Sequence, residues 1–392
     1  MNKITSLTLE GFRSFATNPL PDAHASLPGT GTLSSTLRFG DVTVLIGPNG
    51  AGKSTLVSFF DMLNFMTTGA LQEYVGRQGG ADSLLHYGAR HTPMMRASLI
   101  FKDADEDKES AYTMALAHAA NDTLIFTNEE VSYSRNNHIN PLVNSLGAGH
   151  RESLLKSSAD QGDQTSKVVH NMLFRCRAFH FHDTSDTAKI RLGGYIEDNR
   201  YLRSDAGNLA AFLYGLQQCP DTLPYYQRIE NTVQLAFPQL KRFVLEPQQI
   251  NQNYIRLNWY SRHHPQYMFG HHQLSDGALR FTALTTLLSQ PPGSFHNLIV
   301  LDEPELGLHP YAIALLADMI KSAALSTQIL VATQSPLLVD HFSLEQIRPI
   351  EHRHGRSVIL DLDPEAYGQW LEEYSTGELW EKNIIGGGPS NG

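Results

Sequence analysis

The chain has 392 residues and a formal net charge of −10, and 41% of its residues are hydrophobic. This length allows two or three domain-sized units with a substantial core, and no run of 18 apolar residues is present that would predict a membrane span. The acidic balance argues against a general electrostatic attraction to nucleic acid, and two cysteines are too few for a disulfide framework or a four-cysteine zinc site.

The N-terminal segment Ile4–Leu9 alternates apolar and polar residues, which predicts a strand, and Gly11–Phe15 ends it. A basic region followed by an apolar one would indicate a secretory signal, and the chain does not open in this way. Together with the low cysteine content, this start leads us to expect a cytoplasmic protein. Residues 16–35 are rich in Pro, Gly, Ser and Thr, which predicts a loop.

The most informative segment is Gly47–Ser54, which fits the P-loop pattern for binding nucleotide phosphates. The aliphatic run Val42–Ile46 before it predicts a buried strand, and Ser54–Met66 after it is compatible with a helix. Glycines let backbone N–H groups surround phosphate oxygens, and the N-terminus of the helix adds partial positive charge there. We expect Lys53 to reach the terminal phosphates and the Ser54 hydroxyl to bind Mg²⁺. The residues predicted to contact the nucleotide are Gly47, Pro48, Asn49, Gly50, Ala51, Gly52, Lys53, Ser54 and Thr55.

The middle of the chain predicts a strand meander at 96–133, followed by polar and then helical segments, with 157–166 expected to be mobile. Basic and aromatic residues interleave after it, which is typical either of a surface for nucleic acid or a partner, or of a solvated face with core aromatics. The second interpretation is the simpler one. These residues are Arg175, Arg177, Lys189, Arg191, Arg200 and Arg203, with Phe179, Phe181, Tyr195 and Tyr201.

A second polar segment, Gln273–Arg280, precedes a predicted helix at Leu279–Leu288. Small polar residues and a glycine at such a start offer N–H groups and the Ser275 hydroxyl to an anion. By itself the segment also fits an ordinary helix cap.

The run Leu298–Glu303 has four aliphatic residues followed by two acids, as in a buried parallel strand whose end reaches a ligand site. We expect Asp302 to hold Mg²⁺ and Glu303 to act as general base toward an attacking water. A core strand that ends in a solvated acidic turn is the alternative. Thr327–Pro336 predicts another buried strand, and Gln334 at its end is a candidate to sense a terminal phosphate or orient water.

The order of these motifs resembles an ABC-type ATPase head of the SMC/RecF/OLD-like branch, and within it the stand-alone bacterial AAA-family predicted ATPases. The segments Ile4–Phe15, Glu303–Pro310, Ala332–Pro336 and Gly377–Lys382 are similar to corresponding stretches of that group. The resemblance implies an α/β fold, a mixed sheet with a P-loop core and an α+β lid inserted between two lobes. It covers about 1–95 and 240–392.

We therefore expect an N-terminal ATPase lobe at 1–100, an inserted strand-and-helix lid at 101–240, a C-terminal lobe at 241–362 and a tail at 363–392. The glycine-rich end of the tail predicts disorder, although Trp380 suggests that part of it is docked.

The resemblance also implies a homodimer that encloses two ATP molecules. Ser275, Asp276 and Gly277 of one subunit would close on the γ-phosphate held by the P-loop of the other. Arg13 is a candidate contact to the nucleotide or the P-loop. A glutamine that links Mg²⁺ to the inserted region is expected, and Gln72 and Gln78 are both candidates.

Two positions depart from the pattern. Asp276 stands where transport ATPases have Gly, and Gln334 stands where related proteins often have His. Glutamine does not carry a proton, so we expect slow turnover, not well above about 10 s⁻¹.

The function implied by this resemblance is an ATPase switch that dimerises around ATP and Mg²⁺ and controls a separate effector, such as a nuclease, in anti-phage defence. A RecF-like DNA-repair ATPase that clamps DNA directly is the alternative. The identity of the effector and its trigger stay open.

Overall fold

The computed structural model describes residues 2–17, 30–103, 108–135 and 141–388. Over these residues the chain packs into two compact units. Unit 1 comprises Met1–Ala178, Asn297–Val300 and Leu330–Gly392, and unit 2 comprises Phe179–His296 and Leu301–Ile329. The division of the chain into two lobes, an inserted lid and a tail stays a prediction.

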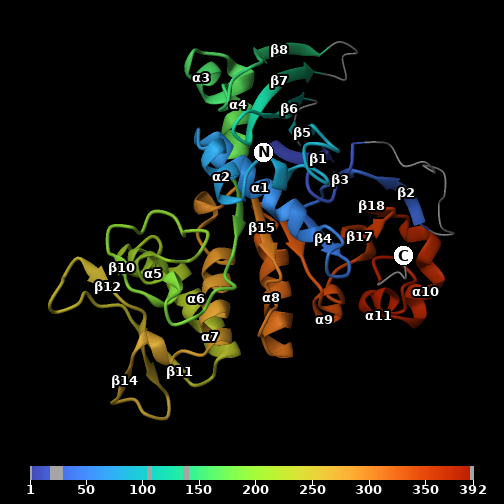
Figure 1. Ribbon diagram of the computed structural model, residues 1–392. Coiled ribbons are helices and arrows are strands. Elements are labelled where there is room, and N and C mark those ends of the chain that lie inside the picture. Colours follow the sequence, from blue (N-terminus) through green and yellow to red (C-terminus); the bar gives the residue numbers. More distant parts are fainter. Residues whose placement is uncertain (1, 18–29, 104–107, 136–140, 389–392) are drawn as a thin grey trace. The chain divides into compact units, whose positions relative to one another are not determined.

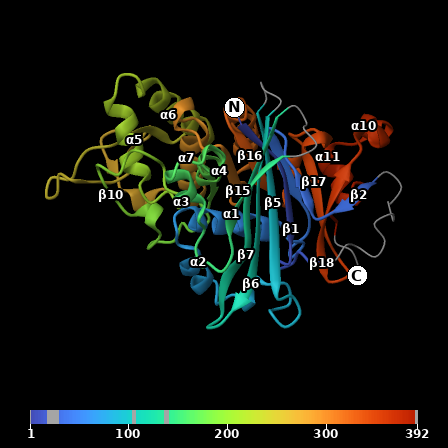
Figure 2. The same ribbon diagram turned by 90° about the horizontal axis from the view of Figure 1, so that it is seen from above.

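Unit 1 contains an antiparallel sheet with strand order β3-β1-β5-β6-β7-β8. Figure 2 shows β1, β5, β6 and β7 side by side in it. The predicted meander is therefore present, and its strands continue the sheet that β1 begins. The strands are β1 (Asn2–Glu10), β3 (Thr36–Arg38), β5 (Met94–Asp103), β6 (Lys108–Ala119), β7 (Thr123–Arg135) and β8 (Leu142–Gly147).

A second, mixed sheet has strand order β2-β18-β17-β4-β16-β15-β9. Strand β4 is buried at all five positions, as its unbroken aliphatic run predicts, and it runs parallel to β17 with Pro349 opposite Ile46. Within β9, β15 and β16 the chain passes from one unit to the other. The strands are β2 (Thr30–Ser34), β4 (Val42–Ile46), β9 (Cys176–Phe179), β15 (Leu298–Asp302), β16 (Gln328–Ala332), β17 (Ile347–Arg353) and β18 (Arg356–Leu362).

Helix α1 fills the core of unit 1. Its Phe59, Phe60 and Leu63 are fully buried and share one apolar cluster with Leu7 and Leu99 of the antiparallel sheet. The helices of unit 1 are α1 (Lys53–Thr67), α2 (Leu71–Arg77), α3 (Leu155–Asp160), α4 (Gln164–Phe174), α9 (Pro336–Val339), α10 (Gly368–Glu373) and α11 (Thr376–Glu381), with 3₁₀ turns at Asp82–Leu84, Leu344–Gln346 and Pro364–Tyr367.

Unit 2 is built on helices, and α7 packs against both α6 and α8 (Figure 1). All residues of α7 from Ala278 to Leu288 are buried, which makes it the central helix of this unit. The elements are β10 (Gly194–Tyr195), α5 (Leu209–Gln218), α6 (Leu223–Ala236), β11 (Leu240–Val244), β12 (Tyr254–Ile255), β13 (Asn258–Ser261), β14 (Met268–Phe269), α7 (Asp276–Leu288) and α8 (Pro310–Ala323), with 3₁₀ turns at Lys189–Arg191, His271–Gln273 and Pro292–Ser294.

Three expectations about irregular segments were wrong. The loop predicted at 16–35 contains β2 in its described part, while 18–29 lie outside the described residues. The segment predicted to be mobile, 157–166, belongs to α3 and to the start of α4, where the Asp163 side chain caps the helix by accepting from Ser166 N. The glycine-rich end of the tail, for which disorder was predicted, is buried from Gly386 to Gly388, and its last four residues lie outside the described part.

Candidate nucleotide site

The P-loop has the backbone conformation that its glycines predict. Strand β4 ends at Ile46, and α1 begins at Lys53. Gly50 and Gly52 have φ angles of 80° and 117°, in the region that favours glycine. A Cβ atom at Gly50 would have no heavy atom within 4 Å, so open space lies beside this residue. The loop therefore joins β4 to the N-terminus of α1 through glycines in left-handed conformations, and backbone N–H groups at such a helix start can bind phosphate.

Lys53 lies across this loop. Its Nζ donates to Gly47 O at 2.5 Å and to Pro48 O at 3.1 Å, and its side chain is buried. Ser54, the next residue, is exposed. Gly52 at the N-cap has no side chain to satisfy the first N–H groups of α1, so they can bond to an anion.

Two serines brace the P-loop inside unit 1. The Ser357 hydroxyl donates to Ala51 O at 2.6 Å, and the Ser14 and Thr55 hydroxyl oxygens lie 3.1 Å apart. Ser357 N also donates to Ser14 O at 2.7 Å. The segment after β1, which the sequence singled out as Gly11–Phe15, thus packs against the start of α1.

The two candidate glutamines occupy different surroundings in unit 1. The Gln72 side-chain amide donates to Leu124 O at 2.9 Å and to Arg151 O at 2.7 Å, so backbone carbonyls hold it at the start of β7. The Gln78 Oε1 atom accepts from Arg13 Nη2 at 2.5 Å. Since Arg13 directly precedes Ser14, Gln78 is the glutamine connected to the P-loop helix.

In the same unit, β16 ends at Ala332 and leads to Gln334, which is half-buried. Thr333 N donates to Leu45 O at 3.0 Å, and this hydrogen bond connects the end of β16 to the end of β4, just before the P-loop. Ser335 caps α9 by accepting from Leu338 N at 3.3 Å.

In unit 2, the predicted signature segment forms the start of α7. The Ser275 oxygen accepts from Ala278 N at 3.3 Å, so Ser275 is the helix cap that the sequence allowed, and its side chain is exposed. Asp276 accepts from Arg191 Nη2 at 2.5 Å, and Arg191 Nη1 donates to Leu274 O at 3.0 Å. The hydrogen bond from Arg191, with a second from Thr184, lowers the pKa of Asp276.

The predicted acidic strand end also lies in unit 2. Asp302 is the last residue of β15, and Glu303 follows it with a φ of 40°, a backbone conformation that non-glycine residues rarely adopt. Such conformations cost about 1–3 kcal/mol and gather at functional sites. Leu306 N donates to Glu303 O at 3.1 Å, which closes the turn. The acidic end of the strand is thus a tight, strained turn.

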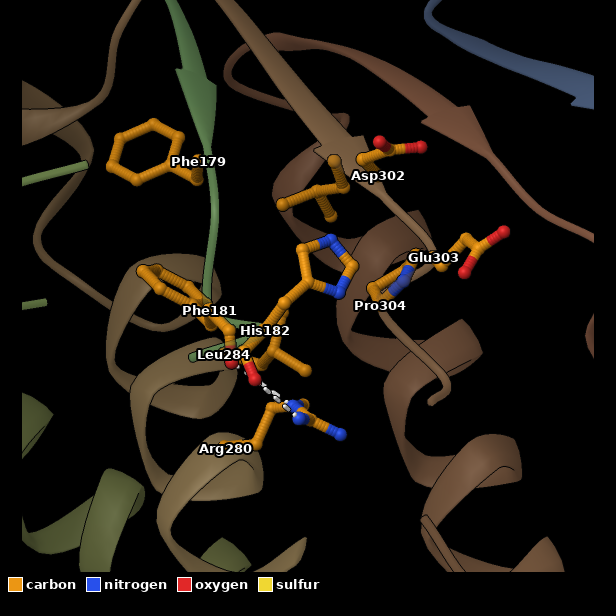
Figure 3. A pocket seen from close by; sticks show the side chains of 9 residues that line it. Phe179, Phe181, His182, Arg280, Leu284, Asp302, Glu303 and Pro304 are labelled. Carbon is orange, nitrogen blue, oxygen red and sulfur yellow. Dashed lines mark hydrogen bonds between the residues drawn. The ribbon is translucent and has the colours of Figure 1, made fainter. Parts of the chain in front are cut away.

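Arg280 joins the signature helix to this turn. Its guanidinium donates to Phe181 O at 3.0 Å, to His182 O at 2.9 Å and to Leu306 O, and burial lowers its pKa. Nearby, a Cβ atom at Gly277 would lie 2.7 Å from the carbonyl oxygen of Gly307, so the two backbones are in direct contact. Figure 3 shows Arg280 below the His182 ring, Asp302 above the ring and Glu303 to its right.

Two cavities border these turns. One of about 10 Å³, lined by Asp302, Glu303 and Arg280, is close to the smallest volume that holds one water molecule (Figure 3). The other, of about 170 Å³, lies between Ser275 and His309 and is lined by both turns. The second is the larger opening beside the exposed signature residues.

The interleaved basic and aromatic residues are divided between buried, half-buried and exposed positions. Arg191 is buried and bonded inside unit 2, and Phe179 and Phe181 are buried as well. Lys189 and Arg203 pair with acids of the same unit, Asp205 and Asp198. The interpretation as core aromatics therefore holds for Phe179 and Phe181, whereas Tyr195 and Tyr201 are exposed. The roles of Arg191 and Arg280 as internal anchors were missed, because no motif connects them to turns far along the chain.

Over the described residues no helix is long and apolar enough to cross a bilayer. Within the same residues, His, Cys, Asp and Glu side chains form no group of three or more suited to a metal ion.

Comparison with known proteins identifies the class. Residues 42–340 match the family model described as "AAA domain, putative AbiEii toxin, Type IV TA system", and the chain belongs to this family. Comparison with curated protein sequences finds no match.

Solved structures of Smc head domains share the fold. One, bound to the C-winged helix domain of ScpA, is 16% identical with a TM-score of 0.54, and the match covers 93% of this chain and 99% of that one. A head from Pyrococcus furiosus with an extended coiled coil, bound to the C-terminal domain of ScpA, is 15% identical with a TM-score of 0.54, covering 95% and 99%. The protein is thus a member of this AAA-domain family, and it has the mixed α/β fold of Smc head domains.

Proposed function

We propose that the protein binds and hydrolyses ATP and that two copies join around two ATP molecules, so that the nucleotide state switches a separate effector protein on or off. The P-loop carries the proposal. The open space beside Gly50, the start of α1 without a side-chain cap, and Lys53 together suit the binding of a chain of phosphates. ATP would draw Lys53 away from the carbonyl oxygens of Gly47 and Pro48 toward its terminal phosphates.

The oxygen ligands proposed for Mg²⁺ suit the ion. Ser54 offers an exposed hydroxyl and Asp302 a carboxylate, and Mg²⁺ prefers such hard oxygen ligands together with phosphate oxygens and water. When bound, Mg²⁺ would neutralise charge on the phosphates. Gln78, bonded to Arg13, is our choice for the glutamine that responds to the ion, since Gln72 is held by backbone carbonyls.

Glu303 is the proposed general base. Its carboxylate takes a proton from water as the water oxygen bonds to the γ-phosphorus and the bond from that phosphorus to the bridging oxygen of ADP breaks. Gln334 offers a hydrogen bond to the γ-phosphate or to the water and takes no proton. We therefore expect a turnover not well above about 10 s⁻¹. Rapid turnover in a steady-state assay would contradict this assignment.

The signature segment is proposed to act on the nucleotide of the partner copy. Ser275 and Asp276 are exposed, and the N-terminus of α7 presents N–H groups at the same place. Asp276 is bonded to Arg191, which offsets part of the charge that a phosphate would otherwise meet. Ser275 and Gly277 would contact the γ-phosphate, with Asp276 beside them.

The effector is proposed to be a nuclease or a toxin component encoded beside this protein and used against phage. The net charge of −10 favours action through a partner over direct clamping of DNA. The test is purification together with the product of the adjacent gene, with nuclease activity measured with and without ATP. Complex formation with ATP-dependent cleavage is the expected result. ATP-dependent duplex binding by the protein alone, falling steeply with salt, would instead support the DNA clamp.

A further inference from the structure

The glycine-rich C-terminal tail is fitted into unit 1. Residues Ile385 to Gly388 are all buried. Gly387 N donates to Glu351 Oε1 at 2.9 Å, and Trp380 Nε1 donates to Gly387 O at 2.8 Å. Each bond joins a backbone group to a buried side chain, so the tail takes one defined path. Figures 1 and 2 both show α11 near β17.

The path demands glycine at two consecutive positions. Gly386 and Gly387 have φ angles of 75° and 72°. A Cβ atom at Gly386 would lie 2.7 Å from Leu360 Cδ1, and one at Gly387 would lie 3.1 Å from Pro349 Cβ and 3.5 Å from Ile46 O. The chain therefore passes close to the last residue of β4, immediately before the P-loop begins.

The strand that anchors the tail also supports the P-loop. Glu351 lies on β17, two residues after Pro349, which is opposite Ile46 in the parallel pair. Ile350 O lies so close to Gly47 that a Cβ atom there would collide with it. Within β17, Pro349 and Glu351 thus contact the tail, and Ile350 contacts Gly47, the first glycine of the P-loop.

The other end of this segment contacts the short helix α9 that follows Gln334, and the residues just after it. Gly377 N donates to Asp340 Oδ1 at 2.7 Å, and Thr376 Oγ1 donates to Phe342 O at 3.3 Å. A Cβ atom at Gly377 would lie 2.6 Å from Pro336 O, so α11 rests directly on the backbone of α9. Helix α9 starts two residues after Gln334.

From these contacts we infer that Ser375–Gly388 is a positioning element of the nucleotide site, which holds the P-loop strand end and the start of α9 in one fixed relation. It acts through the backbone around Gly47 and Pro336 and does not itself touch the nucleotide. The inference rests on the proposed nucleotide binding, because the P-loop it positions is the phosphate site. If this segment only stabilised unit 1, its removal would leave the P-loop conformation unchanged as long as the fold is intact.

The test uses the full chain, a version ending at Asn383, and the matched pair Gly387→Ala and Gly368→Ala. Gly368 has a negative φ, and an added Cβ there meets nothing within 4 Å, so its variant controls for glycine replacement. Hydrogen exchange of residues 47–54 is measured without nucleotide, and ATP affinity is measured by calorimetry, both well below the melting temperature.

We expect the shortened chain to exchange faster at 47–54, with β6 and β7 unchanged, and to bind ATP about tenfold more weakly. Gly387→Ala should show the same effects in smaller measure, and Gly368→Ala none. Equal exchange and equal affinity in the full and shortened chains would overturn the inference. If the full chain binds no ATP, the proposed function fails, and exchange at 47–54 still decides the role of the tail.

Discussion

The phosphate loop of unit 1 and the paired turns of unit 2 are built in different ways. The P-loop takes its form from glycines, and its supports are short hydroxyl side chains such as Ser357. The turns at Ser275 and Glu303 take their form from two long buried side chains, Arg191 and Arg280, which donate to backbone oxygens of several segments. A short contiguous motif therefore determines the conformation of the P-loop, whereas the turns held by arginines depend on residues that are far apart along the chain.

The largest effect is expected from a substitution in the acidic turn of unit 2, and it should appear in kcat. Glu303→Gln removes the proposed base and keeps the shape of the side chain, so kcat should fall by about 10²–10⁴-fold while ATP binding persists. Phosphate release and calorimetry measure the two quantities. Glu372→Gln, at an exposed position of α10, is the control. Normal hydrolysis by Glu303→Gln would show that the base lies elsewhere.

The next effect tests the P-loop. Lys53→Ala removes the ammonium group that bonds to the loop carbonyls and that should move to the phosphates, so ATP affinity should fall by roughly 100-fold, or about 2.7 kcal/mol. Calorimetry with Mg²⁺ and ATP gives the affinity, with the exposed Lys156→Ala as control. Unchanged affinity would mean that the loop does not hold the triphosphate.

These two positions were visible in the sequence because each belongs to a contiguous pattern. Val42–Ile46, Gly47–Ser54 and Leu298–Asp302 carry their strand and loop signals locally, and β4 and β15 begin and end close to where we expected. The bonds from Arg280 to Phe181 and His182 span about a hundred residues, and no local pattern reports such a pair. For the same reason the sequence predicted disorder for the glycine-rich end of the tail, because the bond from Gly387 to Glu351 joins residues that are far apart along the chain.

A smaller effect is expected when Arg280, which holds the turns of unit 2, is replaced. Arg280→Met leaves carbonyl oxygens of Phe181, His182 and Leu306 without their donor, and should lower the free energy of unfolding by about 2–4 kcal/mol. Denaturant unfolding followed by tryptophan fluorescence measures it. The exposed Arg228→Met is the matched control. If both variants unfold alike, the arginine does not hold the turns.

The smallest effect concerns thiol reactivity. Cys176 is buried in unit 1, and burial raises its pKa to about 12, whereas Cys219 in unit 2 is exposed. The thiolate is the reactive form, so Cys176 should stay unreactive across neutral and mildly alkaline pH. A thiol reagent followed by mass spectrometry should label one site per native chain and two after denaturation. Rapid native labelling of Cys176 would show that unit 1 opens at this point.

The central claim is that ATP joins two copies of this chain, and sedimentation of the Glu303→Gln variant tests it most directly. With Mg²⁺ and saturating ATP we predict a species of twice the chain mass of 43.6 kDa, and a single chain when nucleotide is left out. A single-chain species at saturating ATP, with no heat of ATP binding in calorimetry, would contradict the account.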